Sequence, residues 1–351
     1  MLFYLFILFL ICISALIFNL NHYGKINKMV YVVFWGVLLF LLYAFKNTNV
    51  GADFGTYLKF FDEIFTVDWS VIFSEDIDNY TGFEIGYVIL MKLISTISHT
   101  DIFFTIIMAS IMTILPIVMI YKYATPLWMG IFLFFALSLY TNSFSMLRQS
   151  IAMYICWYSI PYIVNRSLLK FLGVVILAFF FHKTALAFIP IYFLYQIRFS
   201  VKFYAISIIG VIIAYVILLP IAALLTSLLS LNDYTDADVS GGYLFFFFVL
   251  FCFILCAYIL RSNTNPYKHA FLHMLFWALI LQLLATKFNI LTRIVDYYKI
   301  SLVVLLPAVI WSPQFKKQRL LVISLFVILF VFYFYKTNVA NLYSVIPYTL
   351  R

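Results

Sequence analysis

The sequence predicts an all-α integral membrane protein, a polytopic helical bundle of about 12 transmembrane helices with an additional outward interfacial helix. Apolar residues make up 66% of the 351-residue chain and charged residues only 10%. Soluble domains contain about 45–50% apolar and roughly 25% charged residues, so a soluble fold could not bury this much apolar surface. Apolar runs recur from Leu2 to Tyr335, which a single secretory or transit segment does not explain. We therefore expect residues 1–351 to form a single polytopic membrane domain.

The individual spans are predicted from apolar runs that approach the ~20 residues needed to cross a bilayer. They lie at about residues 2–18, 29–45, 102–120, 127–143, 149–164, 169–181, 184–197, 203–225, 243–260, 270–287, 299–311 and 319–335. Two polar stretches interrupt them. We expect residues 46–101 to form an outward loop that includes the interfacial helix, and residues 226–242 to form a second outward loop.

The interfacial helix is predicted at residues 84–97, EIGYVILMKLISTI. This segment is apolar, but it is only about four turns long and carries Lys92 in its middle. Counting it as a span would invert all upstream segments and place the loop with Lys25 and Lys28 outside, against the positive-inside bias. A helix lying on the outer membrane surface keeps the charge pattern consistent.

The formal net charge of +9 would suggest a nucleic-acid partner for a soluble protein. In a membrane protein the positive-inside bias explains basic loops, so no nucleic-acid partner is expected. In the predicted topology both termini face outward, and all 13 acidic residues also lie outside. The short inner loops contain Lys25, Lys28, Lys122, Arg166, Lys170, Arg198, Lys202, Arg261, Lys268, Lys316, Lys317 and Arg319. The cysteines lie in apolar runs and are expected to be packing residues.

Five basic residues break this rule, because they map to outward helix ends far apart in the sequence. They are Arg148, Lys183, Lys287, Arg293 and Lys299. A cation near hydrocarbon costs at least ~2.5 kcal/mol on insertion scales and usually marks a cavity or pathway. Together they predict a site for an anionic ligand at the outer membrane surface. The alternative for each residue by itself is snorkelling to lipid headgroups.

Arg148 and Gln149 follow two serines, Ser143 and Ser145, in TNSFSMLRQSIAMY. If either serine caps the next span, Arg148 and Gln149 lie in or near its first turn. A helix N-terminus offers free N–H groups and a guanidinium adds bidentate hydrogen bonds, so this segment predicts a pyrophosphate site. By physics alone, an arginine at the end of a span is also a common interface anchor.

His182, in FFFHKTALAF, lies between two apolar runs at the same outward surface. A histidine there could act as a general base near neutral pH or donate a hydrogen bond to a substrate, although a lone histidine at a helix junction is more often structural. Arg293 and Tyr297, in TRIVDYYKI, are spaced i and i+4, so a helix would present both to one ligand. The alternative is a surface ion pair between Arg293 and Asp296.

Two carboxylates, Asp53 in NVGADFGTY and Glu84 in GFEIGY, could accept a proton from a sugar hydroxyl. The glycines on either side of Asp53 permit sharp turns and close approach of a ligand. Residues 76–78 and 236–238 have the D-x-D form used for metal-bound nucleotide sugars. Such sugars are not normally available outside the cell, so no metal is predicted.

Five segments in order make roughly residues 50–310 resemble the EpsG-like branch of Wzy-type bacterial polysaccharide polymerases. The segments are GADFGTY, FEIGY, SMLRQSIA, FHKTAL and TRIVDYYKI. The RQ-x-x-A and FH-x-x-A-L stretches are the most specific of these. An arginine is expected shortly before the Gly-x-Asp stretch, but residues 46–50 read KNTNV, so Lys46 is its nearest substitute.

The resemblance implies a lipid-linked glycosyl transfer at the outer face of the bacterial cytoplasmic membrane, with neither a metal nor another cofactor. The donor would be a growing glycan on undecaprenyl pyrophosphate. The acceptor would be a hydroxyl of a new lipid-linked repeat unit of O-antigen, capsule or exopolysaccharide. A chain-length regulator and a flippase are the protein partners that the resemblance suggests.

The predicted site combines these residues. Its catalytic members are His182, Arg148, Arg293, Asp53 and Glu84. Its substrate-binding members are Gln149, Tyr297, Lys183 and Lys299. The two arginines are assigned to the pyrophosphate, and the glutamine and tyrosine orient it. The histidine is the first candidate for the base or for a phosphate-side hydrogen bond, and either carboxylate is the second candidate for the base.

Three other functions compete with this interpretation. A transporter or flippase of lipid-linked oligosaccharides would also need cations, but it should show internal symmetry and charges near the midplane. Another lipid-linked glycosyltransferase or ligase of similar build would differ in its acceptor. A membrane acyltransferase would usually place a catalytic histidine deep in the bundle, whereas His182 is nearer an edge.

Overall fold

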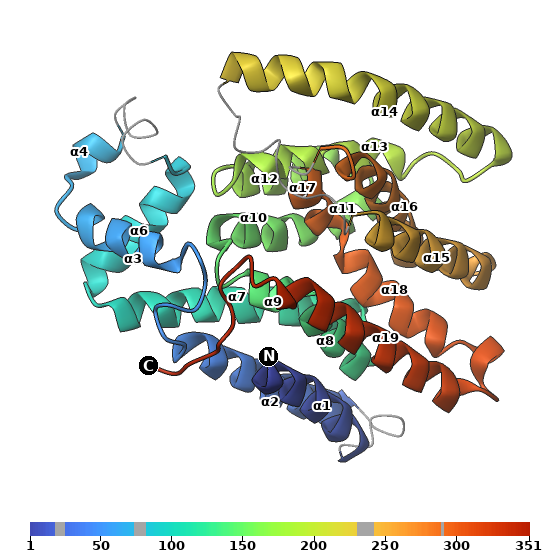
Figure 1. The fold of residues 1–351 in the computed structure, drawn as a ribbon, viewed down its shortest axis with the longest axis horizontal. Helices are drawn as coiled ribbons and strands as arrows, with labels where there is room; N and C mark the ends of the chain where they lie inside the picture. The colour runs from blue at the N-terminus through green and yellow to red at the C-terminus, as the bar shows by residue number, and fades with distance from the viewer. Residues whose placement is uncertain (18–24, 74–81, 230–241, 289–290) are drawn as a thin grey trace.

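The computed structural model describes residues 1–17, 25–73, 82–229, 242–288 and 291–351, and these parts of the chain are almost entirely helical (Figure 1). The longer helices are α2 (Lys25–Ala44), α7 (Asp101–Tyr123), α14 (Val201–Leu229), α15 (Gly242–Leu260), α16 (Pro266–Ala285) and α19 (Arg319–Val339). The shorter ones are α1 (Leu2–Ile17), α3 (Phe54–Ile64), α4 (Trp69–Ile72), α6 (Ile85–Ile97), α8 (Leu127–Ala136), α9 (Leu139–Asn142), α10 (Leu147–Trp157), α11 (Ile160–Val164), α12 (Leu168–Phe179), α13 (Pro190–Leu194), α17 (Leu291–Tyr298), α18 (Ile300–Ile310) and the 3-10 helices η1 (Lys183–Phe188) and η3 (Pro313–Phe315). The all-α prediction is confirmed.

Within the described residues, five helices are long and apolar enough to cross a membrane. They are Asn27–Ala44, Asp101–Tyr123, Gly242–Leu260, Pro266–Ala285 and Arg319–Val339. Seven shorter apolar segments of 10–17 residues accompany them within the described ranges. Helix length and composition therefore make the chain a multi-pass membrane protein, and the total of about 12 spans stays a prediction.

Three of the predicted spans are interrupted helices. The predicted span 127–143 breaks at Ser138, whose φ of 60° places it in the left-handed region. Asn338 of α19 donates a 2.8 Å hydrogen bond to the Ser138 hydroxyl, so the break is buried and satisfied. In the predicted spans 149–164 and 184–197 a new helix starts at a proline: Pro161 is the second residue of α11, and Pro190 is the first residue of α13. A proline lacks the N–H that would continue the preceding helix. Irregular backbone at membrane depth is tolerated where protein covers it.

The described part of residues 46–101 contains the helices α3, α4 and α6, which lie together beside the main bundle (Figure 1). Lys92 points into this group, and its Nζ donates to the carbonyl oxygens of Ile64 and Phe65 at 3.2 and 2.8 Å. The lysine in the middle of the apolar segment thus caps the end of α3. Helix α6 has 13 residues, or roughly 20 Å, which is shorter than the ~30 Å hydrocarbon core. Its interfacial location stays a prediction.

The second predicted loop, residues 226–242, begins later than expected. Helix α14 continues to Leu229, so residues 226–229 are helical rather than part of a loop. Leu228 and Leu229 continue the leucine-rich segment beyond Thr226 and Ser227, and the helix runs through all four residues. Residues 230–241 lie outside the described residues.

The two termini lie close together, and both lie near the loop that carries Asp53 (Figure 1). Tyr4 of α1 donates to the carbonyl oxygen of Val345 at 2.8 Å. The C-terminal segment then runs along the loop, where the N–H groups of Gly51 and Ala52 donate to residues 344 and 343. The C-terminal segment therefore anchors the candidate-site loop to the bundle.

Candidate functional site

A cavity of about 280 Å³ lies at one end of the bundle, between α3, α10, α17 and the junction of α12 with η1. It is lined by Asp53, Thr56, Tyr57, Phe83, Met146, Arg148, Gln149, His182 and Arg293. These residues come from segments more than 200 positions apart in the chain. Five of the nine predicted site residues thus line a single cavity.

Arg148 and Gln149 are the second and third residues of α10, as the sequence predicted. The predicted serine cap is wrong, because Met146 occupies the N-cap position and no side chain caps the helix. Ser145 binds Asp53 instead. Its hydroxyl donates to Asp53 Oδ2 at 3.1 Å and accepts the backbone N–H of Asp53 at 3.2 Å. The serine therefore attaches the Asp53 loop to the start of α10.

Glu84 lies at the start of α6 and contacts both His182 and Arg148. Its Oε1 lies 2.8 Å from His182 Nδ1 and accepts the backbone N–H of Lys183 at 3.2 Å. Its Oε2 accepts a hydrogen bond from Arg148 Nη1. Burial acts to raise the pKa of the Glu84 carboxyl group, but the hydrogen bond with His182 and the charge of Arg148 outweigh burial and lower this pKa to about 2.

Two glycines allow the segments around the cavity to approach one another. Gly51 has a φ of 109°, and a Cβ atom there would lie 2.2 Å from the carbonyl oxygen of Phe144. At Gly86 a Cβ atom would lie 2.6 Å from the carbonyl oxygen of Phe180, which accepts the Gly86 N–H at 2.8 Å. These glycines approach backbone rather than a ligand. Gly55, also predicted to give close approach, has open space around it.

Arg293 lines the cavity from α17, and Gln149 Nε2 donates to its backbone carbonyl at 2.9 Å. Tyr297 lies on the same helix but is buried, and its hydroxyl lies 3.0 Å from Thr184 Oγ1. The structure thus separates the cation from the phenol that the sequence placed together, because Tyr297 faces the packed core. Asp296 pairs with Lys299 at 2.5 Å rather than with Arg293.

The remaining basic residues lie away from the cavity lining. Lys183 is exposed and meets Glu84 through its backbone N–H. Lys299, which pairs with Asp296, also has its Nζ 5.3 Å from the ring centre of Phe245. The Nζ of Lys287 lies 5.2 Å from the ring centre of Tyr215. Lys46, the predicted substitute for an arginine, is buried and donates to the Val50 carbonyl oxygen at 2.7 Å. Its role in this structure is to hold the loop.

Sequence reasoning missed four lining residues, Thr56, Tyr57, Phe83 and Met146. Phe83 supports Arg148, whose guanidinium carbon lies 4.6 Å from the ring centre. The position of Tyr57 could have been inferred, because it lies four residues after Asp53 at the start of a helix. The other three also had a signal, because they lie within the GADFGTY, FEIGY and SMLRQSIA segments that carry the family resemblance.

The described residues contain no group of three or more histidine, cysteine, aspartate or glutamate side chains that could hold a metal ion. Both D-x-D segments, 76–78 and 236–238, lie outside the described residues. The described cysteines are unpaired, and three of the four are buried.

Comparison with known proteins identifies one family. The EpsG family model matches residues 29–350. No curated protein and no solved structure matches the chain. Because the family match covers most of the chain and all the segments that form the cavity, this multi-pass membrane protein belongs to the EpsG family, which is linked to exopolysaccharide synthesis.

Proposed function

We propose that this protein polymerises undecaprenyl-pyrophosphate-linked oligosaccharide repeat units by glycosyl transfer at the outer face of the bacterial cytoplasmic membrane. The observation that carries the proposal is the cavity that combines Arg148, Arg293, Asp53 and the His182–Glu84 pair at one end of an apolar bundle. Such a reaction needs cations for a pyrophosphate leaving group and a base for a hydroxyl nucleophile. Both substrates are lipid-anchored, so the enzyme must lie in the bilayer to reach the reacting bond.

Arg148 is the group best arranged to bind the pyrophosphate. A guanidinium has five N–H donors. Those of Nη1 contact Glu84 and the Gly82 carbonyl oxygen, whereas Nε is buried without a hydrogen-bond partner among the described residues. Its location in the first turn of α10 adds the positive end of the helix dipole. Arg293 supplies a second positive charge to the same cavity.

His182 is the group best arranged to act as the base. When its Nδ1–H donates to Glu84, the neutral ring carries its lone pair on Nε2. A carboxylate that orients a histidine in this way also stabilises the imidazolium that forms during the reaction. Because its pKa is about 2, Glu84 is a poor proton acceptor, and we assign it a positioning role. Asp53 is the second candidate for the base.

The proposed step balances as a single displacement at the anomeric carbon. The acceptor hydroxyl oxygen forms a bond to the anomeric carbon of the donor glycan, and its proton passes to His182 Nε2. The bond between that carbon and the pyrophosphate oxygen breaks, and the electron pair stays on the pyrophosphate. The cavity volume of about 280 Å³ is slightly below the ~300–1,000 Å³ usual for small-molecule sites. The cavity therefore suits the reacting groups rather than a whole repeat unit.

The test is incubation of the purified protein, in nanodiscs, with its cognate lipid-pyrophosphate-linked repeat unit and no nucleotide sugar. The proposal predicts a ladder of glycans of increasing length. Arg148→Ala and His182→Ala should each reduce its initial rate by on the order of 10²–10³-fold. Lys59→Ala is the matched control, because Lys59 is an exposed cation of α3 that does not line the cavity.

Two outcomes would contradict the proposal. Ladders of normal rate in both variants would remove Arg148 and His182 from the reaction. Wild-type protein that binds the lipid and moves it between leaflets without forming a ladder would instead indicate a transporter.

A further inference from the structure

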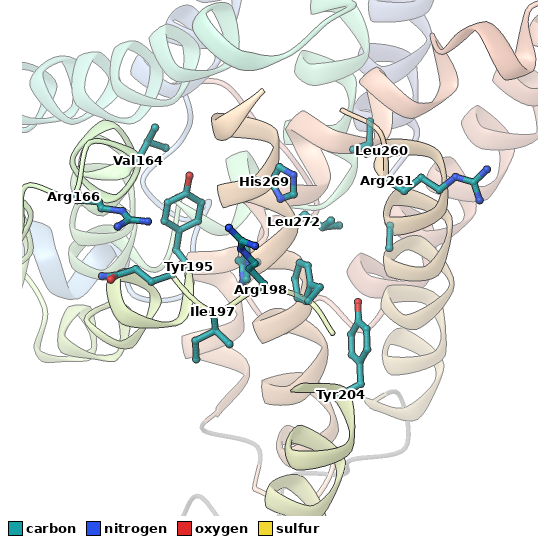
Figure 2. Close-up of a pocket in the computed structure, with 14 residues that line it drawn as sticks. Val164, Arg166, Tyr195, Ile197, Arg198, Tyr204, Leu260, Arg261, His269 and Leu272 are labelled. Atoms are coloured by element: carbon teal, nitrogen blue, oxygen red, sulfur yellow. The ribbon is translucent and has the colours of Figure 1, made fainter. Parts of the chain in front are cut away.

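A larger cavity, of about 650 Å³, lies near the start of α12, whose other end meets the candidate active site (Figure 2 shows the residues that line it). Its walls come from the end of α11, the segment after α13, the start of α14, the end of α15 and the first turns of α16. Helix α12 runs from one cavity to the other: it begins two residues after Arg166, which lines this cavity, and ends three residues before His182, which lines the candidate active site. Its 12 residues span roughly 18 Å. The two cavities are therefore separate sites.

The lining of this cavity is strongly basic. It contains Arg166, Arg198, Arg261, His269 and His273, and none of its 14 lining residues is acidic. None of the three arginines forms an ion pair with a carboxylate in the described part of the chain. In Figure 2, Arg166 and Arg198 extend toward the middle of the group, whereas Arg261 extends away from it. Arginine recognises phosphate through paired N–H donors.

One buried polar atom in the lining also lacks a partner. His273 is only 3% exposed, and its Nδ1 has no hydrogen-bond partner among the described residues. The ring is held in place by Phe199, which stacks on it with ring centres 4.1 Å apart. Buried polar groups are normally hydrogen-bonded. An unsatisfied nitrogen in a basic cavity is an independent indication that a ligand completes the site.

The surroundings of the cavity are apolar and exposed. Ile206 of α14, and Ile254 and Tyr258 of α15, are 58%, 59% and 62% exposed. Both helices contribute to the cavity wall. In a membrane protein such residues face acyl chains. A lipid headgroup could therefore enter the cavity while its chains stay along these helices.

We infer that this cavity binds a phosphate group, carried either by an anionic phospholipid headgroup or by a soluble anion. Arg166 and Arg198 hold the phosphate oxygens, with His269 beside them. In the predicted topology this end of the bundle faces the cytoplasm, where anionic lipids attract basic groups. The inference concerns a site separate from the proposed glycosyl transfer.

The test is titration of the detergent-solubilised full-length protein with three probes: short-chain phosphatidylglycerol, short-chain phosphatidylcholine and inorganic phosphate. Binding is followed by native mass spectrometry for the lipids and by calorimetry for phosphate. We expect phosphatidylglycerol to bind more tightly than phosphatidylcholine. The double variant Arg166→Ala/Arg198→Ala should weaken it roughly tenfold or more, because it removes two charge-assisted contacts.

The matched control is Lys316→Ala/Lys317→Ala, which removes the same charge from two exposed residues that do not line the cavity. It should leave the dissociation constant within twofold of wild type. Binding of inorganic phosphate with the same dependence on the two arginines would identify a soluble anion as the source. The inference would be overturned if both double variants lost affinity for phosphatidylglycerol equally. It would also be overturned if the protein bound neither phosphatidylglycerol nor phosphate more tightly than phosphatidylcholine.

Folding and activity provide separate readouts. Both arginines are exposed, so the double variant is expected to elute and melt like wild type. It should also keep the rate of ladder formation, since its cavity lies at the other end of α12. A ladder lost together with the binding would contradict the separation of the two sites.

Discussion

Glu84 and His182 are 98 residues apart in the chain, yet Glu84 Oε1 lies 2.8 Å from His182 Nδ1. The second oxygen of the same carboxylate accepts a hydrogen bond from Arg148. One buried carboxylate thus holds both the candidate base and the candidate pyrophosphate ligand. Its loss should affect both groups at once.

Replacing this carboxylate should impair the reaction without removing any group that touches substrate. Glu84→Gln keeps the side-chain size but removes the charge that orients His182 and Arg148. We expect the initial rate of repeat-unit addition to fall by on the order of 10²-fold, as for loss of general-base catalysis. Asp62→Asn is the control, because that carboxylate is exposed on α3. A rate for Glu84→Gln within twofold of wild type would show that the charge has no positioning role.

The same carboxylate predicts how stability depends on pH. The pKa of Glu84 is about 2 in the folded protein and about 4.3 in an unfolded chain, so the unfolded state binds more protons between these values. The stabilisation is complete above the unfolded value and is lost as the pH falls toward 2. The melting temperature of wild type should exceed that of Glu84→Gln by a constant difference at pH 5–7, and this difference should shrink below pH 4. Melting curves in detergent would test this, and a difference independent of pH would refute it.

Gly86 should tolerate no side chain, because α6 meets the end of α12 there. A Cβ atom would lie 2.6 Å from the Phe180 carbonyl oxygen, so Gly86→Ala must push the two helices apart and move Glu84 away from His182. We expect a loss of about 1–3 kcal/mol in the free energy of unfolding and a slower reaction. The matched variant Gly55→Ala has open space and should be neutral or slightly stabilising. Equal melting temperatures for the two variants would argue against the contact.

Lys46 should make stability rise with pH. Burial, and next the charge of Arg351, lower the pKa of Lys46 to about 6, against about 10.4 in an unfolded chain. Between these values the unfolded state binds one more proton, so this group makes the protein more stable as the pH increases. Lys46→Met should remove the dependence between pH 6.5 and 9.5, whereas exposed Lys59→Met should keep it. Thermal unfolding across that range provides the measurement, and parallel curves for wild type and Lys46→Met would disprove the assignment.

The helical segments were predictable because hydrophobicity is a local property. Helices α2, α7, α15, α16 and α19 lie close to the apolar runs that predicted them. The breaks at Ser138 and Pro190 were not predicted. The left-handed conformation of Ser138 is held by Asn338, which is 200 residues away, so no local pattern signals it.

The candidate site was predictable only as a set of residue types. Charge placement selected Arg148, Arg293 and His182, because a cation or a histidine at the end of an apolar run is costly unless it has a function. The same reasoning selected Lys299, which the structure pairs with Asp296 instead. Spacing along one helix does not show which face meets a cavity and which meets the core.

By itself, the sequence determined that this protein is a multi-pass membrane protein and which of its residues are candidates for chemistry, since both follow from hydrophobicity and charge along the chain. Only the tertiary structure decided that Glu84 joins His182 to Arg148, that Tyr297 is buried, and that Arg166 and Arg198 line the same second cavity. The physical reason is that these contacts depend on how helices pack. Packing brings together side chains that are tens to hundreds of residues apart, and composition and periodicity do not record it.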